Sequence, residues 1–221
     1  MALDFKDLNK EQKEAVTEIE GPCMIIAGAG SGKTRVLTYK LAYLIERGVS
    51  PYEILSLTFT NKAANEMKER VTNLTGLDAN RIWMGTFHSI FARMLRFEAD
   101  RIGYTRSFSI YDTNDSSNLV KRVMTELEIS TETYNPGAIQ SSISNLKNKL
   151  ILPLEYGNKA FNPFEKKLAE VYNEYQRALH KCNAMDFDDL LIKPLELFSR
   201  FPEILIKYQK RFKFILVDEY Q

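Results

Sequence analysis

The feature that most constrains this chain is a glycine-rich turn between a short apolar run and a helical pattern. The turn consists of Ala27, Gly28, Ala29, Gly30, Ser31, Gly32, Lys33 and Thr34, and we call residues 27–34 the phosphate loop. Small residues let backbone N–H groups turn inward, and the start of a helix adds positive potential. Lys33 is placed to reach the β- and γ-phosphates of ATP, and the Thr34 hydroxyl to bind Mg²⁺. Ala27 replaces the glycine of the strict pattern and is small enough to fit.

The segments around the phosphate loop alternate between strand and helix patterns. Residues 23–27 are apolar and rich in strand formers, which predicts a buried strand, and residues 33–46 place leucines on one helical face. Further strands are expected at 54–58, 81–85 and 214–219, and further helices at 8–20 and 62–74. This alternation favours an α/β fold with a parallel sheet, and it argues against a fortuitous glycine-rich turn.

Helical patterns dominate the region between residues 87 and 212. Helices are expected at 87–101, 115–127, 136–150, 162–182 and 187–200, a short extended piece at 108–111, and connectors at 131–136 and 152–163. We therefore expect an ATP-binding core at 1–86, a mostly helical inserted domain at 87–212, and a core strand returning at 213–221.

Two carboxylates, Asp218 and Glu219, end the last apolar run. Such a pair suits magnesium chemistry, with one carboxylate serving the metal and its neighbour orienting or deprotonating the attacking water. Alone, two acids after an apolar run are usually a strand end. With the phosphate loop present, both features would meet at the carboxyl edge of one sheet.

A second acidic group, Asp186, Asp188 and Asp189, resembles a metal cluster. We prefer Asp186 as the N-cap of the following helix, with Asp189 three residues on. The single tryptophan, Trp83, is expected in the core rather than in a stacking platform.

Composition excludes several classes of protein. With 30 Lys and Arg against 29 Asp and Glu, the net charge is +1, so any DNA binding must come from a local face. Two cysteines are too few for a disulfide framework, and the chain has neither a signal-peptide pattern nor an apolar run long enough to span a bilayer. We expect a soluble, cytoplasmic protein without a membrane partner.

Several blocks together resemble the N-terminal part of the UvrD/PcrA/Rep family of superfamily 1 DNA helicases, through essentially all of the chain. The blocks are residues 8–12 with 15–16, 27–37, 58–70, 85–96, 185–191 and 217–221. The resemblance implies a P-loop NTPase (RecA-like) fold and an ATP-dependent helicase that moves 3′ to 5′ on single-stranded or partly duplex DNA, in repair or replication.

The resemblance also assigns roles near the nucleotide. Gln12 would read adenine, because an amide can pair with the N6 and N7 edge of the base. Arg35 would lie near the nucleotide, and Gln221 would sense the γ-phosphate. Without the resemblance, these three are an ordinary polar helix residue, a surface charge and a terminal glutamine.

Residues after the second and third strands are the candidates for DNA contact. Phe59, Thr60 and Asn61 combine an aromatic ring with small polar groups, which suits base stacking and phosphate contact. Thr86 and His88 follow the third strand, in a block that touches single-stranded DNA in the family. The alternatives are a core side chain for Phe59 and a structural histidine for His88.

The sequence ends at Gln221, within the magnesium block. We therefore expect this chain to bind nucleotide weakly and neither to hydrolyse ATP briskly nor to unwind DNA. A P-loop kinase or another non-motor nucleotide-binding protein, a helicase-nuclease subunit and a non-catalytic DNA-binding module remain alternatives.

Overall fold

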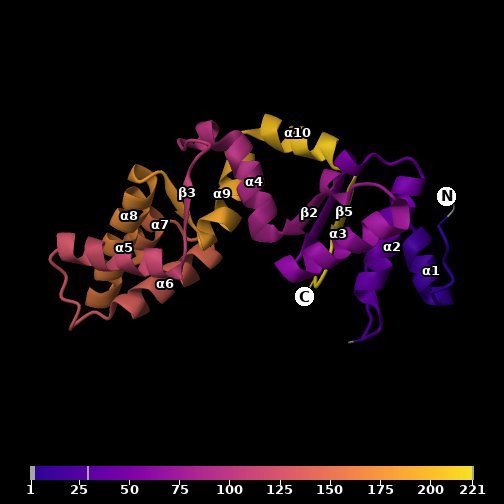
Figure 1. The fold of residues 1–221 in the computed structure, drawn as a ribbon. Helices are drawn as coiled ribbons and strands as arrows, with labels where there is room; N and C mark the ends of the chain where they lie inside the picture. Colours follow the sequence, from indigo (N-terminus) through magenta and orange to yellow (C-terminus); the bar gives the residue numbers. More distant parts are fainter. Residues whose placement is uncertain (1–2, 29, 221) are drawn as a thin grey trace. The chain divides into compact units, whose positions relative to one another are not determined.

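The computed structural model describes residues 3–28 and 30–220, which form two compact units. Unit 1 comprises Met1–Ile90 and Glu203–Gln221, and unit 2 comprises Phe91–Pro202 (Figure 1). Within the described residues, no helix combines the length and apolar character needed to cross a membrane.

Unit 1 is built on a three-stranded parallel sheet with the order β2-β1-β5. Its strands are β1 (Ile54–Thr58), β2 (Trp83–Thr86) and β5 (Phe214–Val217). Thr58 lies opposite Thr86, and Leu57 lies opposite Val217, so the carboxyl ends of all three strands reach the same edge. The predicted parallel sheet is confirmed for these strands.

Helices α1, α2 and α3 belong to unit 1. They span Lys10–Thr17, Lys33–Glu46 and Asn61–Thr75, and short 3-10 turns lie at Pro51–Glu53 and Ala79–Arg81. The core places Leu41 and Leu44 of α2 and Met67 of α3 with Ile54 and Leu216 of the sheet. Helix α1 is shorter than predicted, because Glu18 already has an extended backbone.

The strand predicted at residues 23–27 is wrong for this structure. The segment has no strand assignment, and Met24 and Ile26 are 70% and 90% exposed. An apolar run becomes a strand only when another strand satisfies its backbone N–H and C=O groups. The sheet of β2, β1 and β5 does not pair with this segment.

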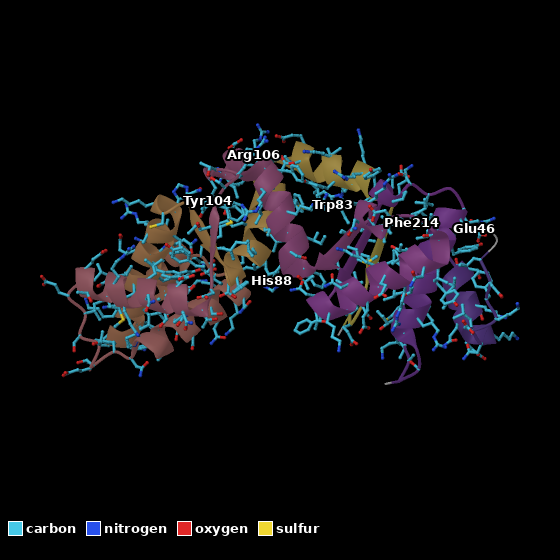
Figure 2. The ribbon with its side chains drawn as sticks, in the orientation of Figure 1. Glu46, Trp83, His88, Tyr104, Arg106 and Phe214 are labelled. Carbon is cyan, nitrogen blue, oxygen red and sulfur yellow. The ribbon has the colours of Figure 1, made fainter. Side chains whose placement is uncertain are left out.

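Helix α10 (Pro202–Arg211) was not predicted and packs on the tryptophan of β2. Trp83, labelled in Figure 2, is buried, which confirms its predicted core position. Its ring lies 6.3 Å from that of Tyr208 and 5.3 Å from that of Phe212, with near edge-to-face geometry. These aromatic contacts tie α10 to the sheet, so the returning part of unit 1 begins at Glu203.

Unit 2 is mostly helical. Its elements are the later part of α4 (Phe87–Glu98), a 3-10 turn (Ala99–Ile102), α5 (Thr113–Glu126), α6 (Pro136–Asn148), α7 (Pro153–Lys159), α8 (Pro163–Lys181) and α9 (Phe187–Arg200). Strands β3 (Ser109–Tyr111) and β4 (Ala184–Asp186) pair in parallel. Helix α7 lies inside the predicted connector at 152–163, so that prediction is wrong for residues 153–159.

Candidate functional site

The phosphate loop folds back on its own carbonyl groups. The Lys33 Nζ donates to the Ala27 carbonyl at 3.0 Å and to the Gly28 carbonyl at 3.3 Å, and the Ser31 hydroxyl donates to the Gly28 carbonyl at 2.7 Å. Ala29 lies outside the described residues. The Lys33 ammonium is thus held at the loop by neutral acceptors, which an anionic phosphate can replace with stronger charge-assisted hydrogen bonds.

Gly32 sets the junction between the loop and α2. It is the N-cap of α2 and has φ +88°, a left-handed conformation that favours glycine. A Cβ at this position would lie 3.0 Å from the Gln12 Nε2. The backbone conformation therefore favours glycine here, and a larger residue would also displace the Gln12 amide slightly.

Gln12 contacts the phosphate loop from α1. Its Oε1 accepts from the Asn9 N–H at 3.0 Å in a capping box that starts the helix, and its Nε2 donates to the Ser31 carbonyl at 2.9 Å. The N-x-x-Q spacing signals the capping box, whereas the contact with Ser31 has no sequence signal. The structure thus places the predicted adenine-reading amide beside the loop.

The first turn of α2 carries Thr34 and Arg35. Thr34 is half-buried, and its carbonyl accepts from the Thr38 hydroxyl at 2.8 Å. Arg35 is exposed and donates to the Asp7 carbonyl at 3.3 Å, so its guanidinium also anchors the N-terminal segment.

Asp218 and Glu219 follow β5 at the carboxyl edge of the sheet. The Asp218 N–H continues the ladder to the Leu57 carbonyl at 2.8 Å, and its carboxylate accepts from the Glu219 N–H at 3.1 Å. Burial, and then the charge of Glu219, raise the pKa of Asp218, while the positive charge of Lys33 opposes that rise. Gln221 lies outside the described residues.

The donor set of this edge fits magnesium. A threonine hydroxyl at Thr34 and a carboxylate at Asp218 are hard oxygen ligands, and Mg²⁺ in nucleotide sites is held by one or two such groups together with phosphates and water. Among the described residues, no group of three His, Cys, Asp or Glu side chains could hold a metal ion.

The segment after β1 leaves an aromatic ring in solvent. Phe59 is 79% exposed, so the alternative of a core side chain is wrong. Thr60 is the N-cap of α3, with its Oγ1 accepting from the Ala63 N–H at 3.1 Å, and Asn61 is the exposed first residue of that helix. This segment presents a stacking surface next to polar groups at the carboxyl edge.

Thr86 and His88 lie where β2 turns into α4. Thr86 is buried, its Oγ1 accepts from the Ser89 N–H at 3.2 Å, and its carbonyl accepts from the Ser89 hydroxyl at 2.9 Å. His88, labelled in Figure 2, is half-buried. Thr86 therefore serves the turn into α4, and His88 is the more accessible of the two.

The acidic group of unit 2 is a helix cap and an ion network. Asp186 caps α9 by accepting from the Asp189 N–H at 2.8 Å, which confirms the predicted N-cap. The Lys147 Nζ, from α6, lies 2.7 Å from Asp186 and 3.0 Å from Asp189, and the Tyr175 hydroxyl donates to Asp186 at 2.9 Å. We call Lys147, Asp186, Asp189 and Tyr175 the ion network.

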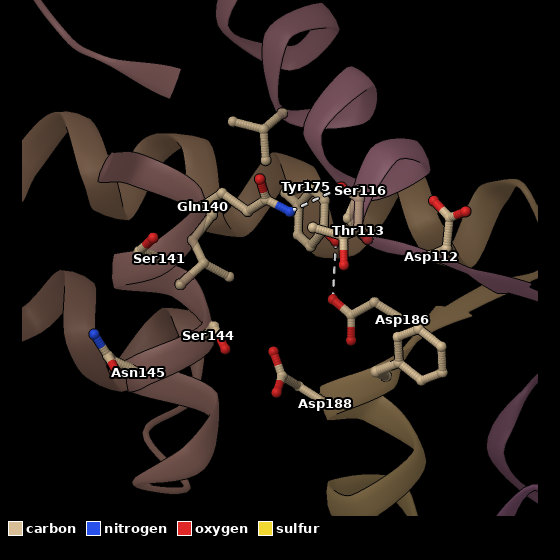
Figure 3. Close-up of a pocket in the computed structure, with 13 residues that line it drawn as sticks. Asp112, Thr113, Ser116, Gln140, Ser141, Ser144, Asn145, Tyr175, Asp186 and Asp188 are labelled. Carbon is tan, nitrogen blue, oxygen red and sulfur yellow. Dashed lines mark hydrogen bonds between the residues drawn. The ribbon is translucent and has the colours of Figure 1, made fainter. Parts of the chain in front are cut away.

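Figure 3 shows Tyr175 and Asp186 at a polar pocket of about 490 Å³ in unit 2.

Lys147 keeps its positive charge within the ion network. Burial lowers the pKa of its ammonium, but the charges of Asp189 and Asp186 outweigh that effect and raise the pKa to about 12. Sequence reasoning missed Lys147, since an isolated lysine in a helical pattern carries no sign of burial.

Comparison with known proteins identifies the family. The model of the UvrD/REP helicase N-terminal domain matches residues 8–221. The chain belongs to the UvrD/REP helicase family. A Staphylococcus aureus relative named ATP-dependent DNA helicase PcrA is 50% identical over 215 residues, which is 97% of this chain and 30% of the relative. A Staphylococcus epidermidis relative of the same name is 51% identical over 218 residues, which is 98% of this chain and 30% of the relative.

UvrD/REP membership confirms the resemblance that the sequence blocks indicated. The mixed α/β architecture, with parallel strands and largely helical content, agrees with a RecA-like helicase domain. The chain spans 30% of the length of these PcrA relatives.

Proposed function

We propose that this chain supplies the ATP-binding part, and part of the DNA-binding surface, of an ATP-dependent helicase that moves 3′ to 5′ on single-stranded DNA. The observation that carries the proposal is that the Gln12 amide contacts the same loop that holds the Lys33 ammonium. Asp218 follows β5 at the carboxyl edge of the sheet in the same unit. Relatives half identical to the chain are named as ATP-dependent DNA helicases.

In this proposal the phosphate loop binds the triphosphate through the N-terminus of α2. Backbone N–H groups of the loop would bind the phosphates, and Lys33 would exchange its carbonyl contacts for phosphate oxygens. Gln12 pairs with the adenine edge, and Arg35 supports the nucleotide from the first turn of α2.

Thr34 and Asp218 would hold the magnesium ion, and Glu219 would orient or deprotonate the attacking water. The ion would supply positive charge that offsets the charge developing on the phosphates. Burial and the neighbouring Glu219 raise the pKa of Asp218, and a bound metal ion would offset both effects. Gln221 senses the γ-phosphate.

DNA contacts come from the ends of β1 and β2. Phe59 stacks on a base, Thr60 and Asn61 contact phosphates, and Thr86 and His88 extend the surface. Because Thr58 and Thr86 are paired, both groups start from neighbouring strands at one edge. The same edge carries Asp218, so the proposed DNA contacts and the proposed magnesium ligand would lie on one sheet edge.

Nucleotide binding by the purified chain tests the proposal. A fluorescent ATP analogue is titrated with Mg²⁺ into wild type, Lys33→Ala and Lys62→Ala, the last removing an exposed lysine of α3. We expect Lys33→Ala to weaken binding by about tenfold or more, because its ammonium pairs directly with phosphate. We expect Lys62→Ala to match wild type.

The same preparations test whether the chain hydrolyses ATP. We expect no brisk DNA-stimulated ATP hydrolysis by the 221-residue chain. Equal ATP affinity in wild type and Lys33→Ala would contradict the proposed site. Phosphoryl transfer to a small acceptor without any DNA dependence would favour a P-loop kinase instead.

A further inference from the structure

Helix α1, which carries Gln12, depends on its neighbours for its position. It has 8 residues and no basic residue in its last turn. Isolated helices shorter than about 12–15 residues are marginal in water, and the partial negative charge at a helix C-terminus is stabilised by a cation. The capping box at Asn9 secures the start of α1, so its other end requires support from elsewhere.

Lys40 of α2 supplies that support. Its Nζ donates to the Ala15 carbonyl at 3.0 Å and also to the Glu18 carbonyl, both at the C-terminal end of α1. Lys40 is half-buried, which favours a fixed contact over a solvated one. One ammonium group thus satisfies carbonyls that the helix leaves open and offsets its dipole.

Two other side chains of α2 hold the chain on the N-terminal side of Gln12. The Arg35 guanidinium donates to the Asp7 carbonyl and the Tyr39 hydroxyl donates to the Asp7 carboxylate, both at 3.3 Å. Burial and the Asp7 charge raise the pKa of Tyr39, so its hydroxyl keeps the proton that it donates. Gln12 therefore lies between an anchor at Asp7 and an anchor at Ala15 and Glu18.

We propose that Lys40 is a positioning residue for recognition of the nucleotide base, an inference that rests on the proposed ATP site. Helix α2 starts at Lys33, so a contact between α2 and the far end of α1 fixes Gln12 relative to the phosphate loop. Two hydrogen bonds from one amide to a base edge require correct distance and direction at both atoms. Loss of the Lys40 contacts loosens the C-terminal end of α1, and a displacement there misaligns the Gln12 amide.

The preference for ATP over GTP distinguishes a positioning role of Lys40 from a role in stability alone. Affinities for ATP, GTP and inorganic tripolyphosphate are measured with wild type and with Lys40→Met, Lys40→Arg and Lys13→Met. Lys13 is an exposed lysine of α1 and is the matched control. We expect Lys40→Met to weaken ATP binding by about tenfold, while tripolyphosphate and GTP change by less than about twofold. Lys40→Arg keeps the positive charge and the N–H donors. We therefore expect it to retain the wild-type preference for ATP over GTP.

A double-mutant cycle with Gln12→Ala tests whether Lys40 acts through Gln12. We expect Lys40→Met to have no further effect on ATP affinity once Gln12 is removed, because coupled residues are not additive. An equal loss for ATP, GTP and tripolyphosphate, or a lower melting temperature with an unchanged ATP-to-GTP ratio, would overturn the proposal. If Lys40→Met does not fold, Lys40→Gln, which keeps an N–H donor without the charge, is measured against the same criteria.

Failure of the site itself gives a different result. If wild type binds none of the three ligands, the proposed function fails for this chain. If wild type prefers ATP and Lys40→Met keeps that preference, the nucleotide site stands and the role of Lys40 is excluded.

Discussion

Phe59 is an exposed aromatic side chain directly after a strand whose five residues are all buried. Exposure of a large apolar ring costs hydrophobic stabilisation, so its position suits a ligand with a flat surface. We predict that Phe59→Ala weakens binding of a fluorescent oligo(dT) by roughly 1–3 kcal/mol, the usual contribution of one stacked base. Fluorescence anisotropy at fixed salt measures the change.

Phe161→Ala is the matched control for the stacking prediction. Phe161 is 92% exposed and lies in unit 2, so its loss removes a similar ring that we do not assign to DNA. Melting temperatures of both variants should stay close to wild type, because neither ring is buried. Equal oligo(dT) affinities for Phe59→Ala and wild type would rule out stacking by Phe59.

Asp218 should make magnesium-dependent nucleotide binding sensitive to pH. Its pKa is raised, mainly by burial, so it takes up a proton at a higher pH than an ordinary aspartate. A proton competes with Mg²⁺ for the carboxylate, so affinity for Mg-ATP should fall as pH falls through this raised pKa. The folded state binds this proton more tightly than the unfolded state, so protonation adds stability while it removes metal binding.

Asp218→Asn tests the origin of that pH dependence. An amide has nearly the same shape but does not titrate and binds Mg²⁺ weakly, so the added affinity that Mg²⁺ gives should be lost at every pH. Titrations of ATP with and without Mg²⁺ over a series of pH values, with wild type and variant measured side by side, give this difference. The assignment fails if the variant retains the wild-type pH profile.

Some residues could be assigned from the sequence because their neighbours in the chain carry the signal. Lys33 and Thr34 belong to one continuous motif, and Asp186 precedes the helix that it caps. The contacts of Gln12 with Ser31 and of Lys147 with Asp186 join residues 19 and 39 positions apart. Such contacts depend on how helices pack, which local patterns do not encode.

At the scale of elements, Lys147 connects α6 to β4 and α9 through the ion network. Its side chain is 1% exposed and faces two carboxylates. We predict that Lys147→Met destabilises the chain by about 3–5 kcal/mol, because removal of one partner leaves buried carboxylates without a cation. Thermal or denaturant unfolding measures the loss.

The deficit of Lys147→Met should shrink as pH falls. Burial and the charge of Asp189 already raise the pKa of Asp186, and removal of the lysine raises it further. Protonation then neutralises the unpaired carboxylate in the folded state. The variant therefore regains folding stability as the pH falls through the raised pKa of Asp186. Lys159→Met, which breaks an exposed pair with Glu155, should cost less than about 1 kcal/mol. Similar losses for both variants would contradict a special role for Lys147.

Long amphipathic helices and the strands β1 and β3 were predicted well, whereas several other short elements were missed. Helices α2 and α9 begin and end at the predicted residues, since each repeats apolar side chains over 14 residues. Helix α7 has 7 residues and β4 has 3, which is too short for a periodic signal. Helix α10 depends on Trp83, a partner that lies more than a hundred positions earlier in the chain.

At the scale of the whole molecule, the sheet of unit 1 has an open side at β5. Strand β5 is the last in the order β2-β1-β5, and Ile215 on it is exposed. Residues 23–27 have the apolar pattern of a buried strand but remain unpaired within the described part of the sheet. Further strands could form hydrogen bonds with the open edge of β5. They could also pair with the exposed apolar segment at residues 23–27.

We therefore predict that residues 23–27 become a paired strand in a form of the chain extended toward the length of its PcrA relatives, of which it covers 30%. In the 221-residue chain the amides of Met24 and Ile26 should exchange rapidly, because their side chains are exposed and no strand protects them. In the extended form their exchange should slow by about a hundredfold or more, as expected for ladder hydrogen bonds in a buried sheet. Hydrogen exchange followed by mass spectrometry measures these exchange rates.

Strand β1 is an internal control, because it is fully buried in the present structure. Rapid exchange at residues 23–27 in both forms would show that this segment is not a strand of the longer form.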